Sequence, residues 1–464
     1  MTGSPIGSPL PRLSEISRCF QGVIPSIVAT SDGKGTPNVT YVSQVFLIDD
    51  HHVALSCQFF NKTRRNLDQN GWAHAEVYDP VTFQAWRLRL RFLRSETSGA
   101  LFDAMALRIQ AIASHTGMEG VFRLIAADVF EVLELERVDI LAEGEAEAEP
   151  GVSLEGLRTE LRGLQWISER IASASDLEQL LDAVLEALDA YFGFRHTMAL
   201  LYDEPTRRLL TMASRGYGES GVGAEVPLGQ GLIGTAAQQR RIFRITGLDA
   251  GLRYGRAIRR EVLAKGEGAA AEIPLPGLCD AQSALVMPLH AGPRLVGVLA
   301  AESRDPLGFG EWHEAYLEVI GNQIALGIDR MLQKAGEEVE AVPEPRIPVR
   351  AAAPAPGRPT RTFVYFRNDD CVFVDGEYLI RNVPGRILWK LLGEWQREGR
   401  TSFTNRELRL DETLGLPKVK DNLESRLILL RRRLKEKCGD VQIVPTARGR
   451  FSLSIEAPIE LLEK

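Results

Sequence analysis

The sequence lacks long apolar runs. Nowhere do about 18 apolar residues follow one another, the length that an apolar helix needs to cross a bilayer. The N-terminal segment MTGSPIGSPLPRL also lacks the basic stretch followed by apolar residues that is typical of a secretion signal. We therefore expect a cytoplasmic protein that neither spans a membrane nor is exported.

Cysteines are few and scattered. Cys19, Cys57, Cys279, Cys371 and Cys438 lie at least 38 residues apart, so the short spacings of zinc and iron–sulfur sites are absent. Isolated thiols of this kind are normally reduced in the cytosol. No Ser/His/Asp order and no paired-carboxylate site stands out, so catalysis would have to draw on a cofactor. The sequence thus predicts no metal site and no catalytic residue.

Neither sign of charge dominates the chain. The chain has 55 Lys and Arg and 62 Asp and Glu, which excludes a protein that is basic over its whole surface and binds nucleic acid in that way. One basic domain is compatible with these numbers. At about 150 residues per domain, 464 residues correspond to three domains. The acidic segment 141–151 and the Pro- and Ala-rich segment 334–360 are linkers by composition. We expect a disordered tail at 1–11 and domains at 12–140, 152–333 and 361–457, called here the N-terminal, middle and C-terminal regions.

Strand patterns dominate the N-terminal region. Segments 24–30, 38–48 and 53–59 are rich in Val, Ile, Thr and Phe. Segment 86–92 alternates apolar residues with arginines, as in a strand with one buried face. A helix at 98–114 and a strand near 128–135 follow. Antiparallel strands with few helices predict a small β-barrel.

The middle region combines helices with strands. Strand-like segments at 196–202, 208–214, 283–289 and 294–301 lie between an entry helix and an exit helix at about 310–333. This order predicts an α/β domain with flanking helices. Such helices are well placed to pair with those of a second copy, so we expect a homodimer.

The C-terminal region reads as a hairpin at 371–380, three helices and a closing hairpin at 442–455. It holds 19 Lys and Arg against 14 Asp and Glu, a surplus of five in a chain that totals −7. An inward leucine stripe on the third helix leaves its polar residues outside, and a basic helix with a basic hairpin fits duplex DNA. The candidate DNA-binding residues are Lys418, Asn422, Ser425, Arg426, Arg431, Arg432, Arg433, Arg448 and Arg450.

This region resembles the winged-helix output domain of bacterial two-component response regulators. The stretches NLESRLILLRRRL at 422–434 and IVPTARGRFSL at 443–453 carry the resemblance, and the second resembles the wing. The resemblance implies binding to double-stranded DNA. A solvated arginine face or a protein-binding module remains an alternative, and no phospho-acceptor receiver pattern precedes the region.

The middle region resembles the GAF sensory domain over residues 165–330. The resemblance rests on GQGLIG at 229–234, SALVMPL at 283–289, VGVLAAES at 296–303 and FGEWHE at 309–314. It implies a pocket for a small molecule near the connection 235–282. The seven arginines of that connection are compatible with an anionic ligand and equally with a solvated or dimer-facing surface, so the ligand stays unknown.

In the N-terminal region a basic and hydroxyl cluster opens a short helix, where backbone amides favour an anion. The stretch PNVTYVSQVFLIDDHHVALSCQFFNKTRRNLDQN at 37–70, followed by AEVYDP at 75–80, resembles the pyridoxamine 5′-phosphate oxidase-related split barrel. The resemblance implies FMN, with its phosphate held near Lys62. The oxidase's C-terminal substrate segment has no counterpart here, which favours flavin binding over oxidase chemistry. The candidate cofactor residues are Thr40, Ser43, Ser56, Gln58, Lys62, Thr63, Arg64 and Asn66.

These predictions combine into a multi-domain α+β protein with an N-terminal split β-barrel, a central α/β GAF domain and a C-terminal winged helix. We expect a transcriptional regulator in which the first two domains sense redox state or a small ligand and control DNA binding. The alternative is a flavin-dependent oxidoreductase whose other domains are regulatory. The sequence does not identify the target DNA, or whether the output activates or represses.

Overall fold

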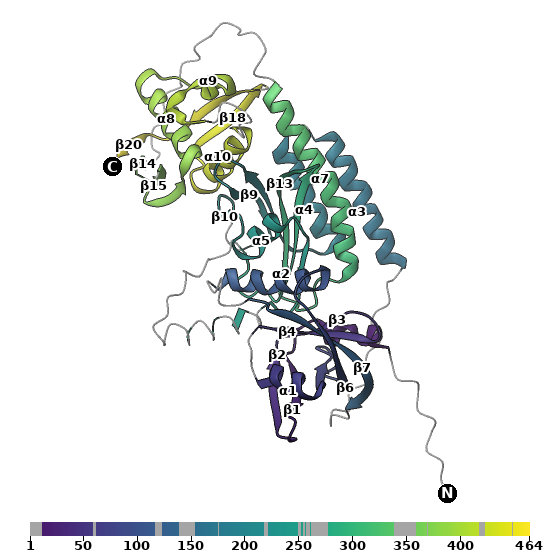
Figure 1. Cartoon of the computed structure of the whole chain (residues 1–464). Coiled ribbons are helices and arrows are strands. Elements are labelled where there is room, and N and C mark those ends of the chain that lie inside the picture. The colour runs from purple at the N-terminus through teal and green to yellow at the C-terminus, as the bar shows by residue number, and fades with distance from the viewer. Residues whose placement is uncertain are drawn as a thin grey trace. The chain divides into compact units, whose positions relative to one another are not determined.

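The computed structural model describes residues 12–58, 62–116, 123–138, 154–174, 176–217, 221–248, 252–253, 256, 260, 277–337, 359–368, 370–416, 423–447 and 449–464. The chain folds as two compact units (Figure 1). The first comprises residues 1–159, 228–287 and 300–317, and the second comprises residues 160–227, 288–299 and 318–464. Among the described residues, no helix is both long enough and apolar enough to cross a membrane.

The N-terminal region forms one curled antiparallel sheet of seven strands in the order β2-β1-β5-β6-β7-β4-β3. Its elements are η1 (Leu13–Phe20), β1 (Ser26–Ser31), β2 (Pro37–Val42), β3 (Val45–Leu47), β4 (His52–Cys57), α1 (Lys62–Asn70), β5 (Trp72–Tyr78), β6 (Ala85–Glu96), α2 (Ala100–His115) and β7 (Ala126–Val138). The alternation predicted for 86–92 is confirmed, because Leu88 and Leu90 are fully buried whereas Arg87 and Arg91 are exposed. Sequence patterns missed β5 as a strand of its own.

The middle region contains a six-stranded sheet in the order β10-β9-β8-β13-β12-β11. Its elements are α3 (Leu154–Ser173), α4 (Leu177–Phe192), β8 (His196–Asp203), β9 (Arg208–Arg215), β10 (Glu225–Pro227), α5 (Gly231–Gln239), β11 (Phe243–Ile245), β12 (Ser283–Ala291), β13 (Arg294–Ser303) and α7 (Glu311–Glu337). The four predicted strands and both flanking helices are confirmed, whereas α4 and α5 were not predicted. A side chain at Gly297 would lie 2.2 Å from the Leu200 carbonyl, so only glycine fits between β13 and β8.

The C-terminal region carries two small sheets around three α-helices. Its elements are β14 (Arg361–Phe366), β15 (Cys371–Val374), β16 (Glu377–Ile380), α8 (Asn382–Glu398), β17 (Ser402–Thr404), α9 (Asn405–Leu410), η3 (Glu412–Leu414), α10 (Leu423–Lys437), β18 (Val441–Ala447), β19 (Arg450–Ile455) and β20 (Ile459–Glu463). The sheet orders are β16-β15-β14-β20 and β17-β19-β18. The chain thus continues past residue 457 into β20, which pairs in parallel with β14.

Turn residues, a helix cap and apolar spacing in the sequence predicted the local structure of this region correctly. Both hairpins form, and Asp375 and Gly376 take the positive φ angles of a tight turn between β15 and β16. Thr404 caps α9 by accepting a hydrogen bond from the Glu407 amide at 3.2 Å. On α10 the stripe of Leu423, Leu427, Leu430 and Leu434 is at most 3% exposed, as predicted.

Candidate functional site

A cavity of about 590 Å³ opens in the N-terminal region. Strands β1, β2 and β4 and helices α1 and α2 line it, with an apolar floor that includes Val28, Leu55 and Leu67. Its volume is in the range of sites that hold small organic molecules. Six of the predicted cofactor residues line it together: Thr40, Ser43, Ser56, Gln58, Thr63 and Arg64.

Lys62 and Asn66 do not line this cavity, contrary to prediction. Lys62 is exposed at the start of α1, and its ammonium donates to the Pro37 carbonyl at 3.3 Å. Asn66 lies one helical turn later and is 2% exposed, with its amide donating to the Thr30 hydroxyl at 3.1 Å. Asn66 therefore fastens α1 to β1. The register of α1, which the sequence does not fix, decides which side chains reach the cavity.

Arg64 reaches the cavity but is already neutralised. Its guanidinium lies 2.5 Å from the Asp128 carboxylate and 3.0 Å from that of Asp68, and it donates to the Ser95 hydroxyl at 2.7 Å. Burial by itself would lower the pKa of Arg64, but the hydrogen bonds and charges of Asp128 and Asp68 outweigh it and raise the pKa. Arg64 therefore stays charged and held by protein groups.

The cavity residues that were not predicted from sequence include Tyr78, Arg108 and Asp128. The Tyr78 hydroxyl donates to the Glu76 carboxylate at 2.5 Å, and this bond, together with burial, raises the pKa of Tyr78 to about 12. Arg108 projects from α2, and its guanidinium donates to the Thr246 carbonyl at 2.9 Å. Only folding brings these residues to one cavity, because they come from β5, α2 and β7.

In the second unit, α10 is buried on a second face as well as on its leucine stripe. Ser425, Arg426, Leu429 and Arg433 are each at most 8% exposed. The prediction that Ser425, Arg426 and Arg433 lie on the outer surface is therefore wrong. The sequence did contain a sign of this second buried face, because the apolar residue Leu429 lies in the middle of it. A helix with apolar residues on two faces is covered on both.

Acidic residues of the middle region cover this face. The buried guanidinium of Arg426 lies 3.3 Å from the Asp203 carboxylate. Arg431 pairs with Glu178 at 3.4 Å, and Arg432 with Asp182 at 2.7 Å, with their side chains 15% and 12% exposed. Arg431 and Arg432 were also predicted to lie outside, and they do not.

Arg433 differs from its neighbours because it is bound within its own region. Its guanidinium donates to the carbonyls of Leu379 at 2.9 Å and Tyr378 at 3.4 Å, which fastens α10 to β16. The nearby Gly223, with φ +89°, would place a side chain 3.4 Å from the Arg433 Cδ atom, so the chain approaches α10 closely there. Of the remaining candidates, Arg450 is exposed at the start of β19, whereas Lys418, Asn422 and Arg448 lie outside the described residues.

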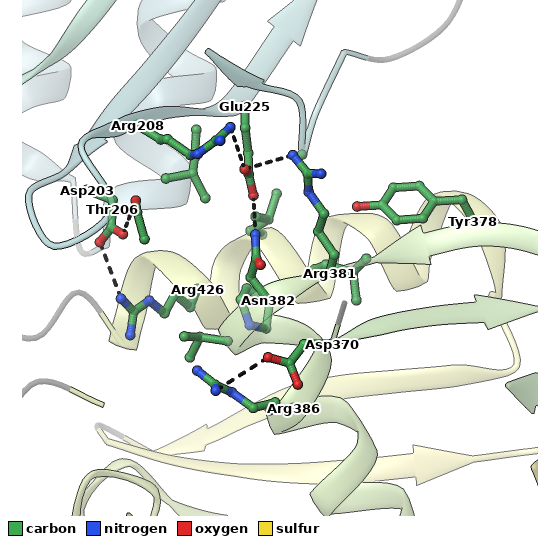
Figure 2. A pocket seen from close by; sticks show the side chains of 16 residues that line it. Asp203, Thr206, Arg208, Glu225, Asp370, Tyr378, Arg381, Asn382, Arg386 and Arg426 are labelled. Atoms are coloured by element: carbon green, nitrogen blue, oxygen red, sulfur yellow. Dashed lines mark hydrogen bonds and ion pairs between the residues drawn. The ribbon is translucent and has the colours of Figure 1, made fainter. Parts of the chain in front are cut away.

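A cavity of about 280 Å³ lies beside the Arg426–Asp203 pair. Figure 2 shows the side chains that line it. At its edge the Glu225 carboxylate, only 7% exposed, accepts hydrogen bonds from Arg381 at 2.9 Å and from Asn382 at 2.8 Å. The Arg208 guanidinium lies 3.4 Å away. Glu225 thus ties the strand β10 to Arg381 and to the first residue of α8. Among the described residues, no cluster of His, Cys, Asp and Glu could hold a metal ion.

Residues 174–329 match the family model of the GAF domain. This match confirms the GAF domain predicted for the middle region, and GAF domains are sensory modules. Half of the connection 235–282, where its pocket was expected, lies outside the described residues, including 261–276. No curated protein matches the chain.

Several solved structures are similar to parts of the chain. The GAF domain of an Acinetobacter phosphoenolpyruvate-protein phosphotransferase is 26% identical, with a TM-score of 0.31, over 38% of this chain and 95% of that one. HupZ of Group A Streptococcus is 23% identical, with a TM-score of 0.22, over 28% and 96%. An FMN-binding protein from Syntrophomonas wolfei subsp. wolfei is 20% identical, with a TM-score of 0.22, over 28% and 84%.

Proposed function

We propose that the chain is a signal-responsive transcriptional regulator whose DNA-binding helix is held by its own sensory domain. One observation carries the proposal: the arginines of α10 that sequence analysis assigned to DNA are paired with Glu178, Asp182 and Asp203. The three carboxylates lie beside the α10 arginines, in the positions that DNA phosphates would take in the proposed complex. Such pairing gives the C-terminal region a state in which α10 does not bind DNA.

The order of elements in the C-terminal region supports its assignment as a winged helix. A leading sheet, three helices and the hairpin β18–β19 follow one another, and β17 pairs with β19 beside the hairpin. In the proposed open state, α10 enters the major groove, while the hairpin with Arg448 and Arg450 contacts the backbone. Lys418 and Asn422 precede α10 and belong to the same proposed surface.

The contact that holds α10 is polar enough to be released. The Arg426–Asp203 pair and the partners of Glu225 line a cavity in which charged side chains stand among apolar ones (Figure 2). Interfaces of this type within a chain are typically transient. A signal opens the contact only if it binds the open arrangement more tightly than the closed one. The GAF domain and the N-terminal cavity are the proposed places for that signal.

The N-terminal cavity fits FMN in volume and in its mixture of apolar, hydroxyl and cationic groups. Thr40, Ser43, Ser56, Gln58 and Thr63 would hold its polar edges. Bound FMN would supply a redox-sensitive group. The phosphate position near Lys62 that family resemblance implies is not supported, because Lys62 lies off the cavity.

A homodimer is part of the proposal. Helices α3 and α7 lie side by side, with the Ser168 hydroxyl donating to Gln323 at 2.6 Å. Val319 and Leu326, seven residues apart on α7, are 50% and 61% exposed, and Leu161 on α3 is 59% exposed. A seven-residue spacing of exposed apolar residues is typical of a helix that pairs with another.

Charge reversal on α4 tests the regulator. Asp182→Lys replaces the ion pair with Arg432 by repulsion, which we expect to raise affinity for duplex DNA about three- to tenfold at low salt, since such a pair contributes about 1 kcal/mol. Fluorescence anisotropy of labelled DNA with the full chain measures it. Glu186→Lys is the matched control, because Glu186 is exposed on the same helix one turn further on.

A second experiment tests whether the α10 arginines contact the DNA phosphates. In the Asp182→Lys protein, changing Arg431 and Arg432 to alanine should lower the slope of log affinity against log salt by about two. Arg433 is left intact because it holds α10 to β16. If no variant binds DNA and the flavin-loaded chain oxidises reduced nicotinamide, the oxidoreductase replaces the regulator.

A further inference from the structure

Arg108 is a cation that has no carboxylate partner among the described residues. It projects from α2 to the N-terminal cavity, and its only described hydrogen bond goes to the uncharged carbonyl of Thr246. Within the described part of the chain it forms no ion pair. The other arginine of the cavity, Arg64, has Asp128 and Asp68. Among the described residues that line the cavity, the charged groups are two arginines and Asp128, so these residues carry one positive charge in excess.

The surroundings of Arg108 disfavour its charge. Burial of the guanidinium, and then the positive charge of Arg244, lower the pKa of Arg108 to about 10. A cation withdrawn from water is costly unless an anion compensates it. Arg108 stays charged at neutral pH, so it is a cation at the wall of a cavity for which the described residues supply no counter-charge. An anion entering the cavity would remove this cost.

We propose that the N-terminal cavity binds a small amphiphilic anion whose phosphate or carboxylate pairs with Arg108. The cavity is much larger than a phosphate ion, so the ligand has an organic body. That body lies against apolar residues such as Val42, Leu55 and Ile112, and its polar edge faces the hydroxyls of Thr40, Ser43 and Ser56. The inference deepens the sensing role proposed above, but it does not depend on DNA binding or on the ligand being a flavin.

The same arginine connects the cavity to residues next to β11. Arg108 donates to the Thr246 carbonyl, and the Thr246 hydroxyl donates to the carbonyl of Gln21, which precedes the cavity residue Gly22. An anion that draws the guanidinium into the cavity competes with the Thr246 carbonyl for its hydrogens. Ligand binding therefore acts directly on the segment 243–248 of the GAF domain.

Inorganic phosphate tests the anion site without knowledge of the ligand. We expect phosphate to raise the melting temperature of the full chain above that in chloride of equal ionic strength, and Arg108→Gln to abolish the rise. Lys62→Ala is the control that keeps it, because Lys62 is exposed and off the cavity. Equal effects of phosphate on the wild type and Arg108→Gln, including no effect on either, would overturn the proposal.

A pair of flavins gives a second test on the unaltered protein. FMN and riboflavin differ only by the phosphate, so calorimetry should show FMN binding about tenfold or more tightly. Arg108→Gln should bring FMN down to the affinity of riboflavin. Equal affinities in the wild type, or a preference that survives Arg108→Gln, would refute Arg108 as the anchor. If neither flavin binds while phosphate acts through Arg108, the proposed flavin sensing fails and the anion site stands.

Discussion

The arginines of α10 and Arg108 on α2 show two outcomes for a cation withdrawn from water. On α10, Arg426 has Asp203 and Arg432 has Asp182. Arg108 has a carbonyl and a cationic neighbour, Arg244. Burial of a cation is therefore no sign of a ligand by itself. A completed ion pair indicates a contact within the protein, whereas a missing counter-charge at a cavity indicates a site for an anion.

The largest expected effect concerns the buried pair on α10. Asp203→Ala removes the carboxylate that pairs with the buried guanidinium of Arg426, and breaking such a pair costs about 3–5 kcal/mol. Arg426 and Asp203 have side chains only 7% and 9% exposed, so solvent does little to relieve the loss. Hydrogen exchange of segment 423–437 as a function of denaturant, measured on the full chain, gives the change in its opening free energy.

The double variant Asp203→Ala with Arg426→Met supplies the control for this experiment. Removing both charges should restore most of the stability, because well-packed apolar residues replace buried ion pairs at little cost. If the double variant is as unstable as Asp203→Ala, the loss of stability comes from packing rather than from the broken ion pair. The contrast drawn between the paired Arg426 and Arg108 would then be unfounded.

A smaller effect is expected from pH at Arg108. Because burial and Arg244 lower its pKa to about 10, the guanidinium is cationic below that pH and loses its charge as pH rises through it. The phosphate-dependent rise in melting temperature should therefore be present from pH 7 to 9 and disappear by about pH 11. Arg64, whose pKa is raised by the hydrogen bonds and charges of Asp128 and Asp68, keeps its charge over this range. A rise that persists unchanged at pH 11 would contradict the assignment, and Arg108→Gln should show no rise at any pH.

The smallest effect on stability is expected for Arg432, at the edge of the contact between α10 and the middle region. Arg432→Ala removes the pair with Asp182, whose side chain is 61% exposed, and should cost about 0.5–1 kcal/mol by the same hydrogen-exchange measurement. High salt should diminish this cost but should leave that of Asp203→Ala nearly unchanged, since buried pairs are screened less. Equal salt dependence for the two variants would show that Arg426 is accessible to water.

Much of the fold could be predicted because its signals are local. The alternation around Leu88 and Leu90, the Asp375-Gly376 turn and the Thr404 cap depend on neighbours in sequence, and all three are confirmed. The sites were predicted only in part. Six of eight proposed cofactor residues share the cavity, but Lys62 lies off it, because the rotation of α1 depends on packing against β1.

The sequence by itself determined most strands of the N-terminal region, although not β5, together with the GAF motifs, the helices of the C-terminal region and the segregation of basic residues there. These features follow from periodicity, turn residues and composition, which act over a few residues at a time. Only the tertiary structure decided which charges meet, because Arg426 and Asp203 are 223 residues apart in the chain. The same holds for Arg108, because only the folded chain shows that the described residues around the cavity offer it no counter-charge.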